Sequence, residues 1–287
     1  MDSKEMLKKI EDGIKECVNK DTFKAYLKAM SLFHNYSFNN SVLIAMQCPH
    51  ATKVAGYMTW KKLGRHVKKG AKGIRIFVPV SRKKKEEEKD EEDARRKTGT
   101  SMDDGKRKAG TDMGTYFMPS TVFDISHTEG VVLPDICTPL SGNIQGNIYG
   151  GDNLLKALYV ISPVDVSFEE IEGSAKGYYS KQRNKIVIKE DMSEVQTFKT
   201  MVHEIAHAIM HSDTEKPRDV KEVEAEATAF IVCSHFGVDT SEYSFEYLAS
   251  WGGQDAKLVK ASFEEIKKTA SNIITQLEEE LKETKTA

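Results

Sequence analysis

One predicted helix restricts the fold of this chain more than any other segment does. Ser193, with Gln196 three residues later, forms a helix-start signal, and apolar residues then recur at helical spacing. Within this amphipathic helix lies the run His203-Glu204-Ile205-Ala206-His207. Because residues four positions apart share one face of a helix, the two imidazoles converge on one point and Glu204 lies beside it.

This pattern of residue types indicates a zinc site. Zinc accepts neutral histidine nitrogens, and a catalytic zinc site keeps one position for a water molecule, on which Glu204 can act as general base. The alternative is that His203 and His207 line an ordinary polar helix face. The ligand types and their spacing favour zinc, so we predict Zn²⁺ as cofactor, His203 and His207 as ligands and Glu204 as the catalytic residue.

A catalytic zinc site also needs a third protein ligand. His211 is rotated by roughly 80° from the face of His203 and is expected to be an exposed histidine. The next predicted helix, residues 221–236 before Gly237, carries Glu222, Glu224 and Glu226. The third ligand is therefore sought among these carboxylates.

A helical wheel separates Glu224 from Glu222 and Glu226, which share one side of the helix. Glu224 shares a polar stripe with Thr228 and His235, whereas Glu226 falls on the apolar arc. A carboxylate that faces the core needs a partner, and zinc is the simplest one. We therefore predict Glu226 as the third ligand, with Glu222 as the fallback. An oxyanion donor is also expected, and four candidates stay open: Tyr178, Tyr179, Tyr247 and His235.

The charge of the chain is unevenly distributed. The net charge of the 287 residues is −2, yet no Asp or Glu occurs between Thr22 and Val80, a stretch that carries ten Lys and Arg. Aromatic and amide side chains are interleaved with these cations. Lys and Arg neutralise phosphates, and exposed rings stack on unpaired bases, so the combination suits single-stranded nucleic acid. The alternative is a solvated basic face over aromatic core residues. The candidate nucleic-acid-binding residues are Tyr36, Asn39, Asn40, Gln47, Lys53, Tyr57, Trp60, Lys61, Lys62, Arg65, Lys68, Lys69, Lys72 and Arg75.

The pattern of elements predicts an α+β protein with two domains. Residues 1–128 form the basic domain, with helical spacing over 4–33, a second helix capped by Asn39, and strands over 74–80 and 115–125 that meet each other. Residues 82–112 form a mixed-charge insertion that we predict to be disordered, and residues 129–152 form a linker. Residues 153–287 form the metal domain. Its strand over 185–188 is expected to be an edge strand that pairs with an extended substrate.

The sequence also argues against two classes of protein. No window approaches the roughly 18 consecutive apolar residues of a membrane span, and the first residues lack the apolar stretch of a signal peptide. The four cysteines are scattered without a C-x-x-C pair. We therefore expect a cytoplasmic protein with no membrane partner.

Two families resemble this chain. The run Tyr36-Ser37-Phe38-Asn39-Asn40, the segment 51–60 and the glycines and lysines over 64–74 resemble the N-terminal domain of ArdC-type antirestriction proteins, including the LtrC-like proteins of mobile elements. That resemblance implies a domain that binds single-stranded DNA; a Gln often stands in the family where this chain has His127. The runs 203–211 and 224–230 resemble the ImmA/IrrE zincin-like peptidases, in which a Glu of an E-x-E-A helix completes a gluzincin-type site.

Two functions are compatible with these features. The first is an antirestriction-type protein of a mobile element that binds single-stranded DNA and cleaves a protein substrate, such as a repressor or a host defence protein, with a zinc-dependent peptidase site. The second is a DNA-protecting protein without proteolysis, whose metal domain is structural or binds a restriction enzyme. Glu204 favours the first, because a purely structural zinc site needs no general base. The antirestriction resemblance favours the second.

Overall fold

The fold was described from a computed structural model. It describes residues 2–16, 19–80, 116–132, 151–238, 240, 243, 245 and 255–286. The predicted disordered insertion over 82–112 and most of the predicted linker over 129–152 lie outside these residues. Among the described residues, the helices are either too short or too polar to cross a membrane.

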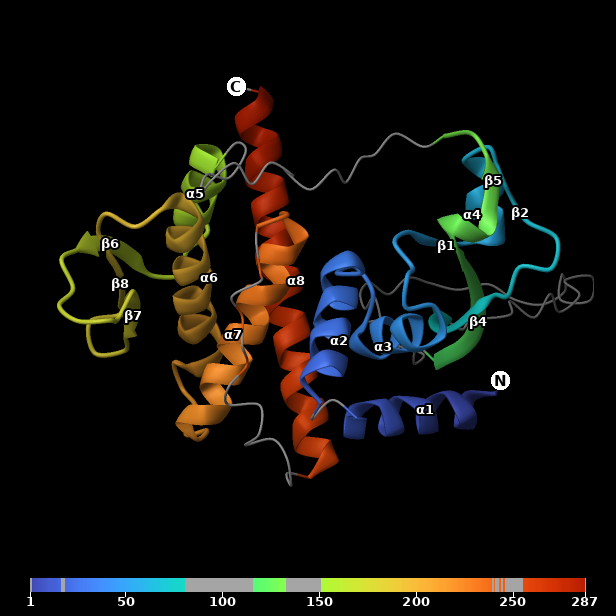
Figure 1. The fold of residues 1–287 in the computed structure, drawn as a ribbon, viewed down its shortest axis with the longest axis horizontal. Coiled ribbons are helices and arrows are strands. Elements are labelled where there is room, and N and C mark those ends of the chain that lie inside the picture. The colour runs from blue at the N-terminus through green and yellow to red at the C-terminus, as the bar shows by residue number, and fades with distance from the viewer. Residues whose placement is uncertain are drawn as a thin grey trace, which may run out of the picture.

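Among the described residues, the N-terminal half contains four α-helices, a three-stranded sheet and a two-stranded sheet, arranged as in Figure 1. The elements are α1 (Ser3–Glu16), α2 (Lys20–Leu32), α3 (Phe38–Gln47), β1 (Val54–Gly56), α4 (Tyr57–Lys62), β2 (Arg65–Val67), β3 (Ile74–Val80), β4 (Tyr116–Asp124), the 3-10 helix η1 (Ile125–His127) and β5 (Thr128–Gly130). β4 lies between β1 and β3 and is antiparallel to both, while β2 pairs with β5. Ile74 pairs with Val122 and Val80 with Tyr116, so the two strands that flank the insertion meet as predicted.

Helix starts in this half differ from the predicted ones in two places. The helical spacing over 4–33 belongs to two helices, because Asn19 caps a new one by accepting a hydrogen bond from the Asp21 N–H. α3 begins two residues earlier than expected: Ser37, not Asn39, accepts from the Asn40 N–H as its N-cap. Periodicity identified the helical faces but did not identify which polar residue caps each helix.

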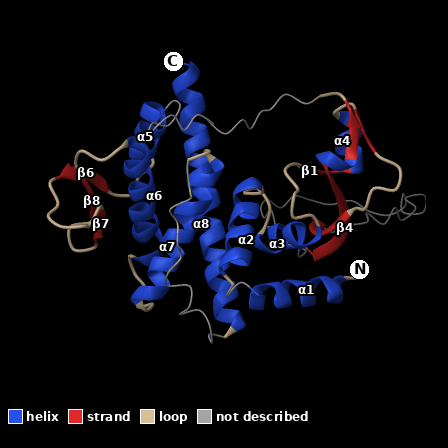
Figure 2. Ribbon diagram, in the orientation of Figure 1, coloured by secondary structure: helices blue, strands red, loops and turns tan. Residues whose placement is uncertain are grey.

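In the C-terminal half, a three-stranded sheet packs against a layer of helices (Figure 2). It comprises α5 (Gly151–Val160), β6 (Asp165–Glu169), β7 (Gly177–Ser180), β8 (Lys185–Lys189), α6 (Glu194–His211), α7 (Arg218–His235) and α8 (Ala256–Thr286). β8 runs parallel to β6 and antiparallel to β7. The prediction that residues 185–188 form an edge strand is therefore wrong, since β8 lies in the middle of the sheet and β7 is at an edge.

One hydrophobic core joins the two halves. The α2 ring of Phe23 lies 4.9 Å from Phe245 and 5.5 Å from Phe263 of α8, measured between ring centroids, and all three side chains are buried. Lys267 of α8 donates hydrogen bonds of 2.9 Å to the carbonyl groups of Met30 and Phe33. A smaller cluster beneath the N-terminal sheet includes Phe33, Ile44, Ile74 and Val122. The helices of the N-terminal half therefore pack as part of the C-terminal helical layer.

Candidate metal centre

α6 holds the histidine pair as the sequence predicted. Ser193 caps the helix by accepting from the Gln196 N–H, and Phe198, Val202 and Ile205 are buried on its apolar face. The Nε2 atoms of His203 and His207 lie 3.0 Å apart. Two nitrogens bound to one tetrahedral zinc, each about 2.0–2.1 Å from it, would lie about 3.3 Å apart, so the pair is close to the spacing of two ligands.

The carboxylate that completes this cluster comes from Glu222 of α7. Its Oε2 lies 3.5 Å from His203 Nε2 and 3.7 Å from His207 Nε2, and these three groups form a set able to hold a metal ion. The hydrogen bonds from the two histidines hold the pKa of Glu222 well below its usual value. For His203, burial acts against protonation, but Glu222 and the nearby Glu204 outweigh it and raise the pKa. The cluster thus attracts positive charge.

The position of Glu226 does not single it out as the third ligand. Glu226 lies one turn beyond Glu222, on the same side of α7, and lines the pocket beside His203. Its Oε1 accepts a 3.5 Å hydrogen bond from the Phe245 N–H, which gives this carboxylate a partner other than a metal. A helical wheel places both residues toward the site and cannot separate them. The described contacts favour Glu222, the fallback.

Glu204, the predicted general base, lies buried beside the histidine pair. It is 7% exposed, it accepts a hydrogen bond from the Tyr179 N–H, and it lines the same pocket as His203. Burial raises the pKa of its carboxyl group, although His203 and His207 act in the opposite direction. A raised pKa brings a carboxylate closer to the range in which it both takes up and releases a proton near neutral pH.

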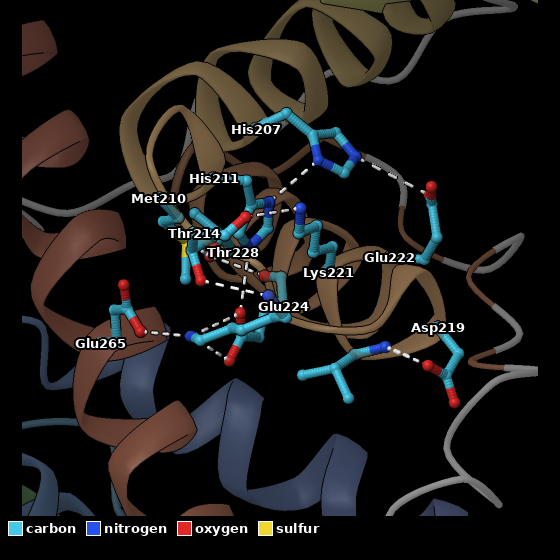
Figure 3. Close-up of polar contacts among 12 residues, drawn as sticks. His207, Met210, His211, Thr214, Asp219, Lys221, Glu222, Glu224, Thr228 and Glu265 are labelled. Carbon is cyan, nitrogen blue, oxygen red and sulfur yellow. Dashed lines mark hydrogen bonds and ion pairs between the residues drawn. The ribbon is translucent and has the colours of Figure 1, made fainter.

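A chain of hydrogen-bonded polar groups extends from His207 through the buried His211 and Glu224 (Figure 3). His207 Nδ1 lies 2.9 Å from His211 Nδ1, and His211 Nε2 lies 2.9 Å from Glu224 Oε2. Lys216 donates to both carboxylate oxygens of Glu224, at 2.8 and 2.9 Å, and to Glu265 at 2.6 Å. The prediction of an exposed His211 is wrong, because α7 packs over it. The polar residues Glu224 and Thr228 of α7 are buried as well.

This chain determines the tautomer of His207. The ionised carboxylate of Glu224 only accepts hydrogen bonds, so the Nε2 of His211 carries the proton and its Nδ1 is an acceptor. Burial keeps the pKa of His211 below its usual value, which favours this neutral form. His207 Nδ1 must then be the donor, so in a metal-bound site the Nε2 of His207 would present its lone pair to the ion held between His203 and Glu222. Histidines that bind metals are oriented by such partners.

A pocket of about 420 Å³ opens beside the histidines. Its walls include Lys176 and Gly177 next to β7, together with Thr200, His203, Glu204 and Tyr243. The sequence analysis missed two residues that line this pocket, Lys199 of α6 and Tyr243. Tyr243 could not be found from sequence, because only the folded chain brings the segment after α7 to α6. His235, a candidate oxyanion donor, does not line this pocket. It contacts the Ser31 carbonyl and Glu278 instead. Tyr247 lies outside the described residues.

Several candidate nucleic-acid-binding residues hold the N-terminal fold together instead. Asn40 Nδ2 donates to the Phe77 carbonyl and Asn40 Oδ1 accepts from the Phe77 N–H, both at 2.8 Å. Gln47 makes the same pair of bonds with Arg75, at 2.9 and 3.0 Å. β3 is an edge strand, so these amides occupy backbone groups that no neighbouring strand covers.

Four further candidates also have structural partners. Trp60 is buried and donates to the Phe123 carbonyl, and the Tyr36 hydroxyl donates to the Val54 carbonyl. The Arg65 guanidinium bonds Thr128 and the Val131 carbonyl, while Arg75 donates to Thr121. Asn39 and Lys53 are half-buried. The four residues with partners are therefore positioned to stabilise the domain, whereas Asn39 Oδ1 is buried without a partner among the described residues.

The remaining candidates are exposed. Tyr57 is 51% exposed, and the exposed cations are Lys61, Lys62, Lys68, Lys69 and Lys72. Lys68 also donates to the Ser126 carbonyl. The sequence analysis missed Phe117, a β4 side chain that is 64% exposed. Exposed cations and exposed aromatic rings, among them Tyr57, Tyr116 and Phe117, therefore remain available on the N-terminal half.

Comparisons with known proteins agree with this division of the chain. Residues 3–110 match the family model of the N-terminal domain of anti-restriction factor ArdC, and residues 162–271 match that of the IrrE N-terminal-like domain, a peptidase family. The chain is thus an α+β protein with a zincin-type C-terminal domain. Its N-terminal domain is of the ArdC type, so both resemblances are confirmed.

The chain also resembles one curated protein and solved ArdC structures. It is 28% identical over 312 residues to an uncharacterized protein of Bacillus anthracis, covering 98% of this chain and 52% of that protein, so it spans about half the length of the curated relative. Metal-free antirestriction ArdC protein from the R388 plasmid has a TM-score of 0.51 at 17% identity, over 84% of this chain and 85% of that one. Its Mn(II)-bound structure gives 0.48 at 18%, over 85% and 88%.

Proposed function

We propose that this chain is an antirestriction-type protein that binds single-stranded DNA and hydrolyses a protein substrate at a metal site. The observation that carries the peptidase proposal is the convergence of two histidine nitrogens and an α7 carboxylate beside the buried Glu204. The ArdC-type and IrrE-like domains support both halves of the proposal. We place the protein in the cytoplasm, in keeping with the free Cys48 and Cys233.

We propose zinc as the metal, held by His203, His207 and Glu222, with Glu226 as the competing third ligand. Two imidazoles and one carboxylate suit a catalytic zinc that keeps a position for water. When bound, zinc lowers the pKa of that water and polarises a carbonyl group. Glu204 takes up the proton of the attacking water and passes it to the leaving amine.

β7, the edge strand beside the pocket, replaces β8 as the strand that pairs with an extended peptide.

A Glu204→Gln variant tests the peptidase. We expect it to bind as much zinc as the wild type and to lose cleavage of fluorescein-labelled casein by at least about 100-fold, the lower range for a lost general base. Glu215→Gln, at an exposed glutamate of the α6–α7 loop, is the matched control and retains full activity. Retained turnover by Glu204→Gln would exclude Glu204 as the base.

The third ligand is tested by two single variants. We expect Glu222→Ala to lose zinc affinity while Glu226→Ala keeps it, as measured by competition with a chromophoric chelator. The opposite result assigns the ligand to Glu226.

The second candidate function is DNA protection without proteolysis. The exposed lysines with Tyr57 and Phe117 favour it, because this surface needs no metal to bind a single strand. Wild type that binds zinc and single-stranded DNA but leaves casein and restriction-enzyme subunits intact would favour this candidate over the peptidase.

A further inference from the structure

A second group of metal-ligand side chains lies in the N-terminal half. Cys48, His50 and His127 each offer one ligand atom, and these three atoms all lie within 4.8 Å of one another. Cys48 Sγ is 3.5 Å from His50 Nε2. None of them belongs to the pocket of the first site, and they come from opposite ends of the N-terminal sequence: the end of α3 and the 3-10 helix after β4.

The backbone around these residues is held in place by one buried carboxylate. Asp124 is 1% exposed and accepts hydrogen bonds from the Thr52 N–H at 2.8 Å, the Lys53 N–H at 3.1 Å and the Ser126 N–H at 2.9 Å. It therefore ties the segment that follows Cys48 and His50 to the segment that carries His127. A site whose ligands are fixed before binding loses little entropy when the ion enters.

Cys48 is fixed as well. Its N–H donates to the Ile44 carbonyl at the end of α3, and its carbonyl accepts from the Ala51 N–H. Its side chain is buried in the small cluster beneath the N-terminal sheet. The cysteine is thus held rigidly at the base of the turn that presents His50.

One ring nitrogen in this group lacks a hydrogen-bond partner among the described residues. It is His127 Nδ1, which is buried. A buried polar atom without a partner costs about 1–3 kcal/mol, so such atoms often mark a bound ion or water.

We infer that Cys48, His50 and His127 form a second metal site, for a zinc-like transition ion bound by one thiolate and two imidazoles. Sulfur and imidazole ligands select zinc, cobalt or copper over magnesium and calcium. In this role the ion would link the turn after α3 to η1. The site is independent of the peptidase proposal, because the α6–α7 cluster contains no sulfur.

Cobalt titration of the full chain under reducing conditions tests this inference, because a thiolate bound to Co²⁺ gives a sulfur-to-metal charge-transfer band that a histidine–carboxylate site cannot give. We expect about two equivalents of Co²⁺ per chain, one of them producing the band. Cys48→Ser and His127→Gln should each abolish the band and about one equivalent. Cys233→Ser, at a buried cysteine whose Sγ lies 3.6 Å from the Tyr243 hydroxyl, should keep it.

This experiment distinguishes the two metal sites. His203→Asn should lose the first site and keep the charge-transfer band, so failure of the peptidase site does not affect the result. Thermal unfolding with and without Zn²⁺ checks that each variant folds, and the zinc-induced rise in Tm should shrink in His127→Gln. A wild type with no charge-transfer band, or a band that survives Cys48→Ser, overturns the inference and leaves a plain Cys48–His50 hydrogen bond.

Discussion

At the scale of single residues, His211 shows how a sequence-based interpretation fails. The predicted rotation of roughly 80° between His203 and His211 about the helix axis is correct. His211 nevertheless lies four residues after His207 and therefore on the same face as that histidine. Sequence alone gives the direction of a side chain and not the element that covers it. Here α7 covers it and supplies Glu224, which is fully buried.

A His211→Asn variant should weaken metal binding without touching a ligand. The change removes the acceptor that orients His207, and loss of such a partner costs about 10–100-fold in metal affinity. Chelator competition with Zn²⁺ measures it, with circular dichroism to confirm folding. His66→Asn, at an exposed histidine of β2, is the control. Unchanged affinity would mean that His207 is oriented by His203 and Glu222 alone.

His34 should make the chain sensitive to mild acid. Burial, aided by the neighbouring His235, lowers its pKa from 6.5 to about 4. Between these values the unfolded chain binds a proton that the folded chain does not, so stability present above pH 6.5 is lost as the pH falls toward 4.

Urea unfolding at pH 7 and pH 5 measures this loss. The wild type should lose up to about 2 kcal/mol more than His34→Gln between the two pH values. An equal loss in both proteins would contradict the assignment to His34, and His66→Gln should behave like the wild type.

At the scale of elements, α3 acts as a cover for the edge of β3. Asn40 and Gln47 are two turns apart on one face of the helix, and each pairs with both backbone groups of one strand residue. The sequence correctly predicted helix, strand and the pairing of β3 with β4. It could not distinguish an amide that binds a base from one that binds a backbone, because both use the same donor and acceptor.

Removing one of these amides should therefore affect stability and not DNA binding. Asn40→Ala leaves the Phe77 N–H and carbonyl without partners, at an expected cost of about 1–3 kcal/mol in the free energy of unfolding. Urea unfolding measures the cost. The affinity of the folded variant for a single-stranded oligonucleotide should match the wild type; a large loss would return Asn40 to the DNA-binding surface.

The exposed cations should show the opposite behaviour. A variant with Lys61, Lys62, Lys69 and Lys72 changed to Gln should bind single-stranded DNA more weakly, and the slope of log affinity against log salt should fall by about 0.7 for each lost phosphate contact. Each change should alter the free energy of unfolding by no more than about 0.5 kcal/mol. Lys282→Gln in the exposed part of α8 is the control. An unchanged slope would exclude this surface.

At the scale of the whole molecule, the two domains of the family comparison do not correspond to two separate cores. The sequence divides cleanly by charge and motif, yet Phe23, Leu27 and Met30 of α2 are buried in the same cluster as Phe263 and Ile266 of α8. Apolar periodicity marks a buried face without specifying its partner. The partner of the α2 face lies more than 200 residues away in sequence, so the sequence could suggest residues 1–128 as a unit but not what its helices pack against.

The isolated segment 1–132 should consequently be unstable, because the α2 face that packs on α7 and α8 would be exposed to water. Each large apolar side chain exposed forfeits about 1.5–3 kcal/mol, and a domain holds only about 5–15 kcal/mol in total. We expect the fragment to bind a hydrophobic dye and to lack a cooperative thermal transition. The full chain should unfold both halves together, as followed by Trp60 fluorescence and by loss of metal binding at His203 and His207. A fragment that melts cooperatively near the Tm of the full chain would show instead that the N-terminal half folds independently and only docks onto α7 and α8.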